Sequence, residues 1–280
     1  MKFERETHLK LFILGLLVLV STGLSAQSEQ MTFGIVPQQA ASKLARSWSP
    51  VFDFLSRQSG LKIQFATAKD IPTFERQLDA GDYDFAYMNP YHFTVFNRHP
   101  GYQAVARARD KKIKGIIVVR KDSPIQSIEE LDQMTLAFPA PAAFAASILP
   151  RSELLSRGLD FQSRYVSSHD SVYLAVAKGI YPAGGGVIRT FNNIATETRD
   201  QLRVLWTSQG FTPHAIAANP DVSAEAMASM QSALVDMEQS DEGRALLKRL
   251  NIKGFEAAEN KDWDDVRSLK IDLPTDIFGQ

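Results

Sequence analysis

Two short segments of the sequence carry groups that could bind a small anion. Asn89-Pro90-Tyr91 follows a strand-like run, with Asn89 placed to cap a helix and Pro90 at its first position. Ser168-His169-Asp170 stands at a similar junction, where Ser168 can cap a helix and Asp170 suits the positive end of its dipole. Backbone N–H groups in the first turn of a helix lack partners within it, so both segments are candidate anion sites.

The elements that must position these segments alternate between strand and helix. Expected strands cover 31–36, 61–66, 84–88, 115–119, 135–138, 164–166 and 202–207, and expected helices cover 40–59, 71–80, 142–157, 171–178, 224–238 and 242–250. The chain from Ala215 onward is expected to be mostly helical. This order predicts an α/β protein whose strands are joined by right-handed crossovers.

The strand–helix pattern occurs twice, which predicts two lobes, each a mixed sheet flanked by helices. We expect residues 27–115 to form the first part of lobe 1, residues 116–210 to form lobe 2, and residues 211–280 to return to lobe 1 with C-terminal helices. Ligands of open α/β sheets bind beyond the carboxyl ends of strands. The sequence therefore predicts a ligand cleft between the lobes.

The N-terminus has the pattern of a secretory signal peptide. Lys2, Arg5 and Lys10 precede the apolar run 11–20, and a stretch of small residues ends at Ala26. The run is shorter than the roughly 20 residues that span a bilayer. We expect residues 1–26 to direct export to the periplasm; an uncleaved N-terminal anchor is the alternative. The chain has no cysteine, which excludes a lipoprotein anchor and disulfides.

Composition and motifs argue against several other functions. A formal net charge of −1 gives no basic footprint for nucleic acid. The glycines at 184–186 are not followed by Gly-Lys-Ser/Thr, so they predict a turn behind the cleft, not a phosphate loop. The acidic residues Asp79, Asp82 and Asp84 lack calcium-loop spacing. With no recognisable catalytic motif, we predict no enzyme activity, no catalytic residue, no cofactor and no bound metal.

Several motifs in order along the chain resemble one transport family. They are Gly34-Ile35-Val36-Pro37-Gln38-Gln39, the run from Gly81 to Tyr91, Asp122-Ser123-Pro124-Ile125 with Ile128-Glu129-Glu130-Leu131, Ser168-His169-Asp170-Ser171-Val172, and Gly254-Phe255 with Asp262-Trp263. From about Thr32 to about Val266 the chain resembles the periplasmic phosphate, phosphite and phosphonate binding proteins of ABC transporters.

The resemblance implies a type II periplasmic-binding fold that closes about a hinge when a small anion bridges the lobes. It implies delivery of that ligand to an ABC permease in the inner membrane, and we expect a monomer. The alternative is a periplasmic sensor partner of a membrane histidine kinase or receptor with an altered ligand preference.

The same resemblance carries functional residues over to this sequence. It implies an aromatic ligand contact near Tyr91 with Tyr87 close by, a hydrogen bond from His169 to the oxyanion, and helix-start contacts at Asn89, Ser168, Ala142 and Ala143. Tyr87 could instead be only a core residue, and His169 could be an exposed loop residue. His92 is expected to line the cleft, whereas His99 and His214 read as surface or structural residues.

Two departures from the family pattern weaken this expectation. Alanines occupy positions 142, 143, 145 and 146 where the family has a run of hydroxyl side chains, and Pro182 stands where the family has an aspartate. Each lost hydrogen bond to a charged ligand is worth about 1.5–3 kcal/mol. The residues therefore leave open whether the protein still binds phosphonates, binds a different ligand in preference, or has lost phosphonate binding. Phe144 adds apolar surface that would suit a ligand with an organic tail.

Overall fold

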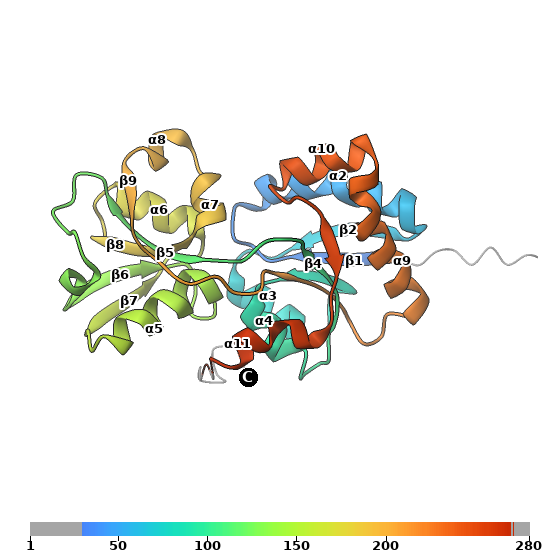
Figure 1. The fold of residues 1–280 in the computed structure, drawn as a ribbon, viewed down its shortest axis with the longest axis horizontal. Coiled ribbons are helices and arrows are strands. Elements are labelled where there is room, and N and C mark those ends of the chain that lie inside the picture. Colours follow the sequence, from blue (N-terminus) through green and yellow to red (C-terminus); the bar gives the residue numbers. More distant parts are fainter. Residues whose placement is uncertain (1–29, 270, 272–280) are drawn as a thin grey trace, which may run out of the picture.

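The computed structural model describes residues 30–269 and 271. The expected signal peptide, with its apolar run at 11–20, lies outside the described residues. Two lobes lie side by side, each built around its own sheet (Figure 1). Within 30–269, no helix is long and apolar enough to cross a membrane.

The larger lobe contains a six-stranded mixed sheet in the order β11-β4-β10-β3-β1-β2. Its strands are β1 (Gln30–Ile35), β2 (Lys62–Thr67), β3 (Phe85–Met88), β4 (Gln103–Ala108), β10 (Ala215–Ala218) and β11 (Phe255–Ala257). Its helices are α2 (Ala41–Ser59), α3 (Ile71–Asp79), α4 (Pro90–Phe96), α9 (Ala224–Val235), α10 (Asp241–Arg249) and α11 (Asp264–Arg267), with 3₁₀ turns η3 (Asp236–Gln239) and η4 (Asn260–Trp263).

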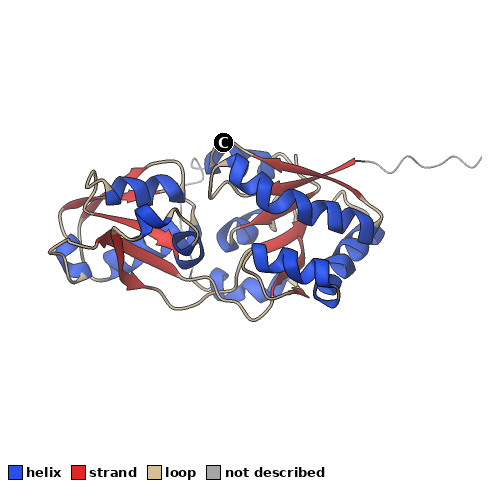
Figure 2. Cartoon of the chain, turned by 90° about the horizontal axis from the view of Figure 1, so that it is seen from above, coloured by secondary structure: helices blue, strands red, loops and turns tan. Residues whose placement is uncertain are grey.

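The smaller lobe contains a five-stranded mixed sheet in the order β7-β6-β8-β5-β9. Its strands are β5 (Gly115–Arg120), β6 (Met134–Phe138), β7 (Phe161–Tyr165), β8 (Ala183–Val187) and β9 (Leu202–Thr207). Its helices are the 3₁₀ turn η1 (Ile128–Leu131), the π-helix η2 (Phe144–Ile148), α5 (Leu149–Ser156), α6 (His169–Ala177), α7 (Ile188–Asn192) and α8 (Thr196–Arg199). Helices cover the faces of both sheets (Figure 2).

Local sequence signals explain the first helices of the larger lobe. Helix α2 buries Leu44, Trp48 and Leu55 along one face and ends at Gly60, whose φ of 74° is left-handed. Helix α3 is capped by Asp70, which accepts a hydrogen bond of 2.8 Å from the backbone N–H of Thr73. Both helices were predicted from periodicity and breakers, and both are confirmed.

Several strands were missed because they lack an alternating pattern. The prediction of a mostly helical chain from Ala215 is wrong at β10, which lies fully buried and antiparallel between β3 and β4. The glycines at 184–186 do not form a turn; they form most of β8 between β5 and β6. Short strands buried on both faces show no polar–apolar alternation, and glycine has low strand propensity. Strands β4 and β11 were also not predicted.

The glycines of β8 allow two segments to pack directly on its backbone. A Cβ at Gly185 would lie 1.9 Å from the carbonyl oxygen of Ala146 in η2. A Cβ at Gly184 would lie 2.5 Å from Val172 of α6, and one at Gly186 would lie 2.3 Å from the hydroxyl of Tyr173. Strand β8 thus fixes the positions of η2 and α6, both of which begin at the boundary between the lobes.

The chain crosses between the lobes twice, at 109–114 and 208–214. These crossing segments pair through Ile113 and Phe211, whose backbone groups exchange hydrogen bonds of 2.8 and 3.0 Å. The two crossing segments thus run antiparallel to each other and connect the two sheets in the middle of the molecule (Figure 1).

We predict that Gly185→Ala lowers the free energy of unfolding by about 1–3 kcal/mol, because the added methyl group overpacks η2. Gly254→Ala is the matched control: its Cβ would meet only the flexible ends of Glu238 and Arg109, at 3.0 and 3.2 Å. Urea unfolding measures both. A midpoint for Gly185→Ala no lower than that of Gly254→Ala would contradict the packing argument.

Candidate functional site

A small inner cavity lies between the lobes, where segments from both meet. From the larger lobe it is lined by Gln38, just after β1, and Asn89, just after β3; from the smaller lobe it is lined by Ala143, His169 and Val187. Its volume is about 10 Å³. A space of this size holds about one water molecule. The lobes are therefore nearly closed on each other.

Asn89 both caps a helix and bridges the lobes. Its Oδ1 accepts a 2.8 Å hydrogen bond from the backbone N–H of His92, and its Nδ2 donates to the carbonyl oxygen of Ala142 at 3.1 Å. The first-turn N–H of His92 is thereby occupied. An anion could use this N–H only by displacing the Asn89 side chain.

His169 presents an imidazole to the inner cavity from the first position of α6. Its ring is 1% exposed. Its Nδ1 lies 3.1 Å from the hydroxyl of Thr190, and its Nε2 has no hydrogen-bond partner among the described residues. The single proton of the Thr190 hydroxyl has two acceptors within reach, Nδ1 of His169 at 3.1 Å and the carbonyl oxygen of Val187 at 3.0 Å. When it is donated to Nδ1, the neutral ring carries its proton on Nε2 and can donate one hydrogen bond to a ligand.

The backbone around His169 is already paired. Its N–H donates to the carbonyl oxygen of Gln38 at 3.2 Å, across the lobe boundary. Ser168 caps α6 by accepting a hydrogen bond of 3.1 Å from the N–H of Ser171. The start of α6 thus holds the lobes together through a protein acceptor at a place where a ligand oxygen could bind.

The alanine-rich segment after β6 contributes surface without side-chain donors. Ala142 and Ala143 are buried, and Phe144 packs edge-on against Phe211 with ring centroids 5.4 Å apart. The segment continues into a π-helix, an irregularity often found at functional sites. The Ser147 hydroxyl, the first after the alanines, is buried with no hydrogen-bond partner among the described residues. Any polar contact from 142–146 must come from the backbone.

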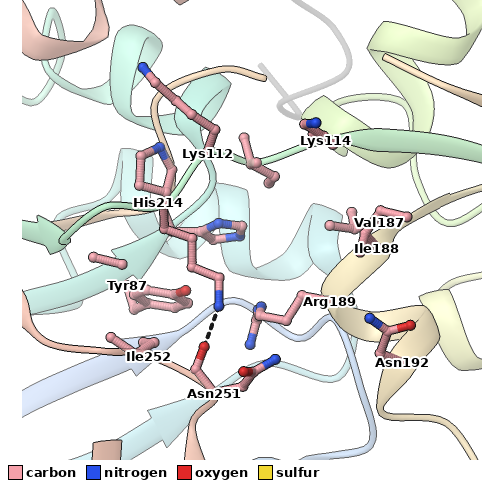
Figure 3. A pocket seen from close by; sticks show the side chains of 14 residues that line it. Tyr87, Lys112, Lys114, Val187, Ile188, Arg189, Asn192, His214, Asn251 and Ile252 are labelled. Atoms are coloured by element: carbon pink, nitrogen blue, oxygen red, sulfur yellow. Dashed lines mark hydrogen bonds between the residues drawn. The ribbon is translucent and has the colours of Figure 1, made fainter. Parts of the chain in front are cut away.

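A larger outer cavity adjoins the inner one on the side of the crossing segments. Its volume is about 140 Å³. Figure 3 shows Arg189 reaching into it from α7, opposite Tyr87 of β3 and His214 of the returning crossing segment. The lining residues also include Lys111, Lys112, Lys114, Asn192, Asn251 and the apolar Ala108, Ile113, Val187, Ile188, Pro213 and Ile252.

Gln38 connects the two cavities. Its Oε1 accepts a hydrogen bond of 2.6 Å from Arg189, and its Nε2 lies 3.1 Å from Nε2 of His214. His214 also stacks on Tyr87, with ring centroids 4.8 Å apart. With its carbonyl oxygen bonded to His169, this one glutamine contacts the smaller lobe at two points.

Comparison with known proteins identifies the architecture. A family model described as the periplasmic substrate-binding protein of phosphonate ABC transporters matches residues 33–263. The chain belongs to this family. The match spans both lobes and includes Gln38, Asn89, His169 and Arg189.

Two curated relatives are similar over most of the chain. A phosphate-import protein, PhnD, of Mycolicibacterium smegmatis is 22% identical over 246 residues, covering 76% of this chain and 73% of that protein. A phosphonates-binding periplasmic protein of Escherichia coli is 21% identical over 260 residues, covering 88% and 77%.

Solved structures of this phosphonate-transporter family share the fold. A binding protein component of an ABC phosphonate transporter from Pseudomonas aeruginosa superposes with a TM-score of 0.81 at 18% identity, covering 87% of this chain and 86% of that one. PhnD1 of Prochlorococcus marinus, solved with methylphosphonate, superposes with a TM-score of 0.79 at 17% identity, covering 86% and 97%. The predicted two-lobed type II fold is thus confirmed, and the family acts in transport.

Some of the residues proposed from sequence line the cavities and others do not. Asn89, Ala143 and His169 line the inner cavity, and Tyr87 lines the outer one. Ala142 contributes its carbonyl oxygen to Asn89, Ser168 caps α6, and Tyr91 is buried in α4 outside both lining sets. Their roles as ligand contacts stay predictions.

Two expectations about individual residues need correction. His214 does not lie at the surface: it is buried, and it lines the outer cavity. His92 does not line either cavity: it is buried in α4, and its ring nitrogen Nε2 lies 2.7 Å from Glu75 of α3. Pro182, which stands where the family has an aspartate, is exposed just before β8, and Val187 lies at the cavity end of that strand.

Sequence reasoning missed Gln38 and Arg189. Both follow the carboxyl ends of strands, Gln38 after β1 and Arg189 just after β8. The switch-point rule marks Gln38 as a candidate once β1 is placed. Arg189 had no such signal because β8 was not recognised as a strand.

We predict that stability falls as the pH drops below about 6.5, the ordinary histidine pKa. Burial, reinforced by the charge of Arg189, lowers the pKa of His169 to about 3, and burial also lowers the pKa of His214. Between the ordinary histidine pKa and the lowered pKa of each residue, the unfolded chain binds a proton at that position while the folded chain does not. Acid therefore favours unfolding.

For His169 this amounts to about 2 kcal/mol at pH 5. Urea unfolding at pH 7.5 and pH 5 measures the loss, and His169→Gln is expected to lose less on acidification than the unchanged protein. An identical loss in both proteins would show that His169 is not held neutral.

Proposed function

We propose that this protein captures a small oxyanion, a phosphonate, phosphite or phosphate, between its lobes for import. The observation that carries the proposal is His169, a buried histidine that lines a cavity bounded by both lobes and whose Nδ1 alone contacts another described side chain. The M. smegmatis relative is named for phosphate import, and the P. marinus structure holds methylphosphonate. Both ligands present oxygens that accept hydrogen bonds.

Binding would proceed by exchange of contacts between the lobes. The inner cavity of about 10 Å³ has no room for a phosphonate group. The ligand therefore enters an open form, and its oxygens take over the donors that now serve Gln38 and Ala142: the N–H of His169 and the Nδ2 of Asn89. The lobe formed by 116–210 would move as one body about the paired crossings.

The rest of the proposal concerns export and delivery. A binding protein of this family works in the periplasm with an inner-membrane permease, and we propose that residues 1–26 are removed after export. The absence of cysteine argues for a free protein, not a lipid-anchored one, and we propose a monomer. The receptor partner considered above stays a prediction, since the family match favours a permease.

We expect at least one of methylphosphonate, phosphite and phosphate to raise the melting temperature of the purified protein. A ligand that binds only the folded state stabilises it by about 2.7 kcal/mol at a concentration of 100 times Kd. Differential scanning fluorimetry measures the shift, with sulfate and chloride as anion controls. A flat response to all three phosphorus oxyanions would contradict the proposed ligand class.

We further expect His169→Ala to weaken oxyanion affinity by about tenfold or more, because it removes a buried hydrogen bond to a charged group. His99→Ala is the matched control, since the His99 side chain is 78% exposed and lines neither cavity. Isothermal titration calorimetry measures both variants. Unchanged affinity in a folded His169→Ala protein would remove His169 from the site.

A further inference from the structure

The outer cavity is strongly basic. Lys111, Lys112, Lys114 and Arg189 are among the residues that line it, and none of its lining residues is an aspartate or glutamate. It lies between the lobes and against both crossing segments, next to the inner cavity. A cavity lined by one sign of charge concentrates counter-ions of the other sign.

Arg189 has no carboxylate partner among residues 30–269 and 271. Its recorded hydrogen bond is the 2.6 Å contact from its guanidinium to the neutral amide oxygen of Gln38. A guanidinium binds a carboxylate or phosphate in a bidentate, charge-assisted arrangement that is roughly twice as strong as a neutral hydrogen bond. The Gln38 oxygen therefore occupies a position that an anionic oxygen would fill more favourably.

Lys111 is the second cation of this cavity. Its Nζ donates to the carbonyl oxygen of Asn251, and its side chain is half-buried with no acidic partner in the described part of the chain. Burial, followed by the charges of Arg189 and Lys253, lowers the pKa of Lys111. Two cations placed close together without an acid repel each other, and a bound anion removes that cost.

The outer cavity continues from the inner one. Ile113 and Val187 line both, and Gln38 lines the inner cavity while its amide reaches Arg189 and His214 of the outer one. A ligand whose head contacts His169 would thus send its tail past the Gln38 amide towards Arg189. At about 140 Å³, the outer cavity has room for a short organic tail.

We propose that the outer cavity is a second anion subsite, and that the ligand is a small phosphonate carrying a second anionic group such as a carboxylate. Arg189 and Lys111 bind that group, and Gln38 gives up its hydrogen bond to Arg189 when the ligand enters. The proposal rests on the proposed function, which places the phosphonate head beside His169. It assigns the selectivity of the site to charged side chains in place of the hydroxyl donors missing from 142–146.

Three ligands that share a phosphonate head and differ in tail charge test the proposal: methylphosphonate, phosphonoacetate and 2-aminoethylphosphonate. Calorimetry at pH 7.5 is expected to show phosphonoacetate binding about tenfold or more tightly than methylphosphonate, and 2-aminoethylphosphonate binding more weakly than both. The tighter affinity should fall with added salt more steeply than that of methylphosphonate.

Arg189→Gln is expected to bring the phosphonoacetate-to-methylphosphonate affinity ratio to within about threefold of one, and Lys111→Gln to reduce it by a smaller factor. Lys62→Gln is the matched control for net charge: Lys62 is exposed at the amino-terminal end of β2, and its loss should leave the ratio unchanged. Circular dichroism checks that each variant is folded. The comparison of the three ligands on the unchanged protein tests the proposal even if a variant fails to fold.

The outcomes separate the two proposals. Equal affinities for the three ligands, tighter binding of 2-aminoethylphosphonate, or a ratio untouched by both Arg189→Gln and Lys111→Gln would overturn the second subsite while leaving oxyanion capture intact. Failure of every phosphonate, phosphite and phosphate to bind would overturn both.

Discussion

The closed arrangement depends on Gln38. Its carbonyl oxygen accepts the N–H of His169, its Oε1 accepts a guanidinium hydrogen of Arg189, and its Nε2 meets His214. Because Gln38 is buried, each of these groups would lose a partner if the residue moved without replacement. A ligand that enters the cleft must supply oxygens that accept the hydrogen bonds now accepted by the two oxygens of Gln38. An oxyanion has such oxygens.

The same constraint explains how a site can persist without hydroxyl side chains at 142–146. Strand β8 is glycine-rich, so the π-helix η2 lies directly on its backbone and brings the alanines to the cleft. Small side chains let the lobes approach closely, and in the proposed site the donors come from His169, Asn89 and Arg189. Burial, reinforced by the charge of Arg189, lowers the pKa of His169 and of His214, so the imidazole of His169 acts as a polar group and not as a fixed positive charge.

Much of the fold could be predicted from sequence because its helices have clear faces, caps and breakers, as in α2 with Gly60 and α3 with Asp70. Strands β8 and β10 could not, since their partners lie far away in sequence and burial on both faces removes alternation. The site divides in the same way. Asn89 was proposed from a local helix-start signal and His169 from such a signal together with the family resemblance, whereas Arg189 and His214 come together only through the tertiary arrangement.

A crystal structure of the protein with methylphosphonate would show directly whether an oxyanion binds between the lobes in exchange for Gln38 contacts. We expect phosphonate oxygens within hydrogen-bonding distance of His169 Nε2 and of at least one donor from the larger lobe, with the His169 N–H released from Gln38. Phosphonate bound outside both cavities, or bound with all three Gln38 contacts unchanged, would contradict it.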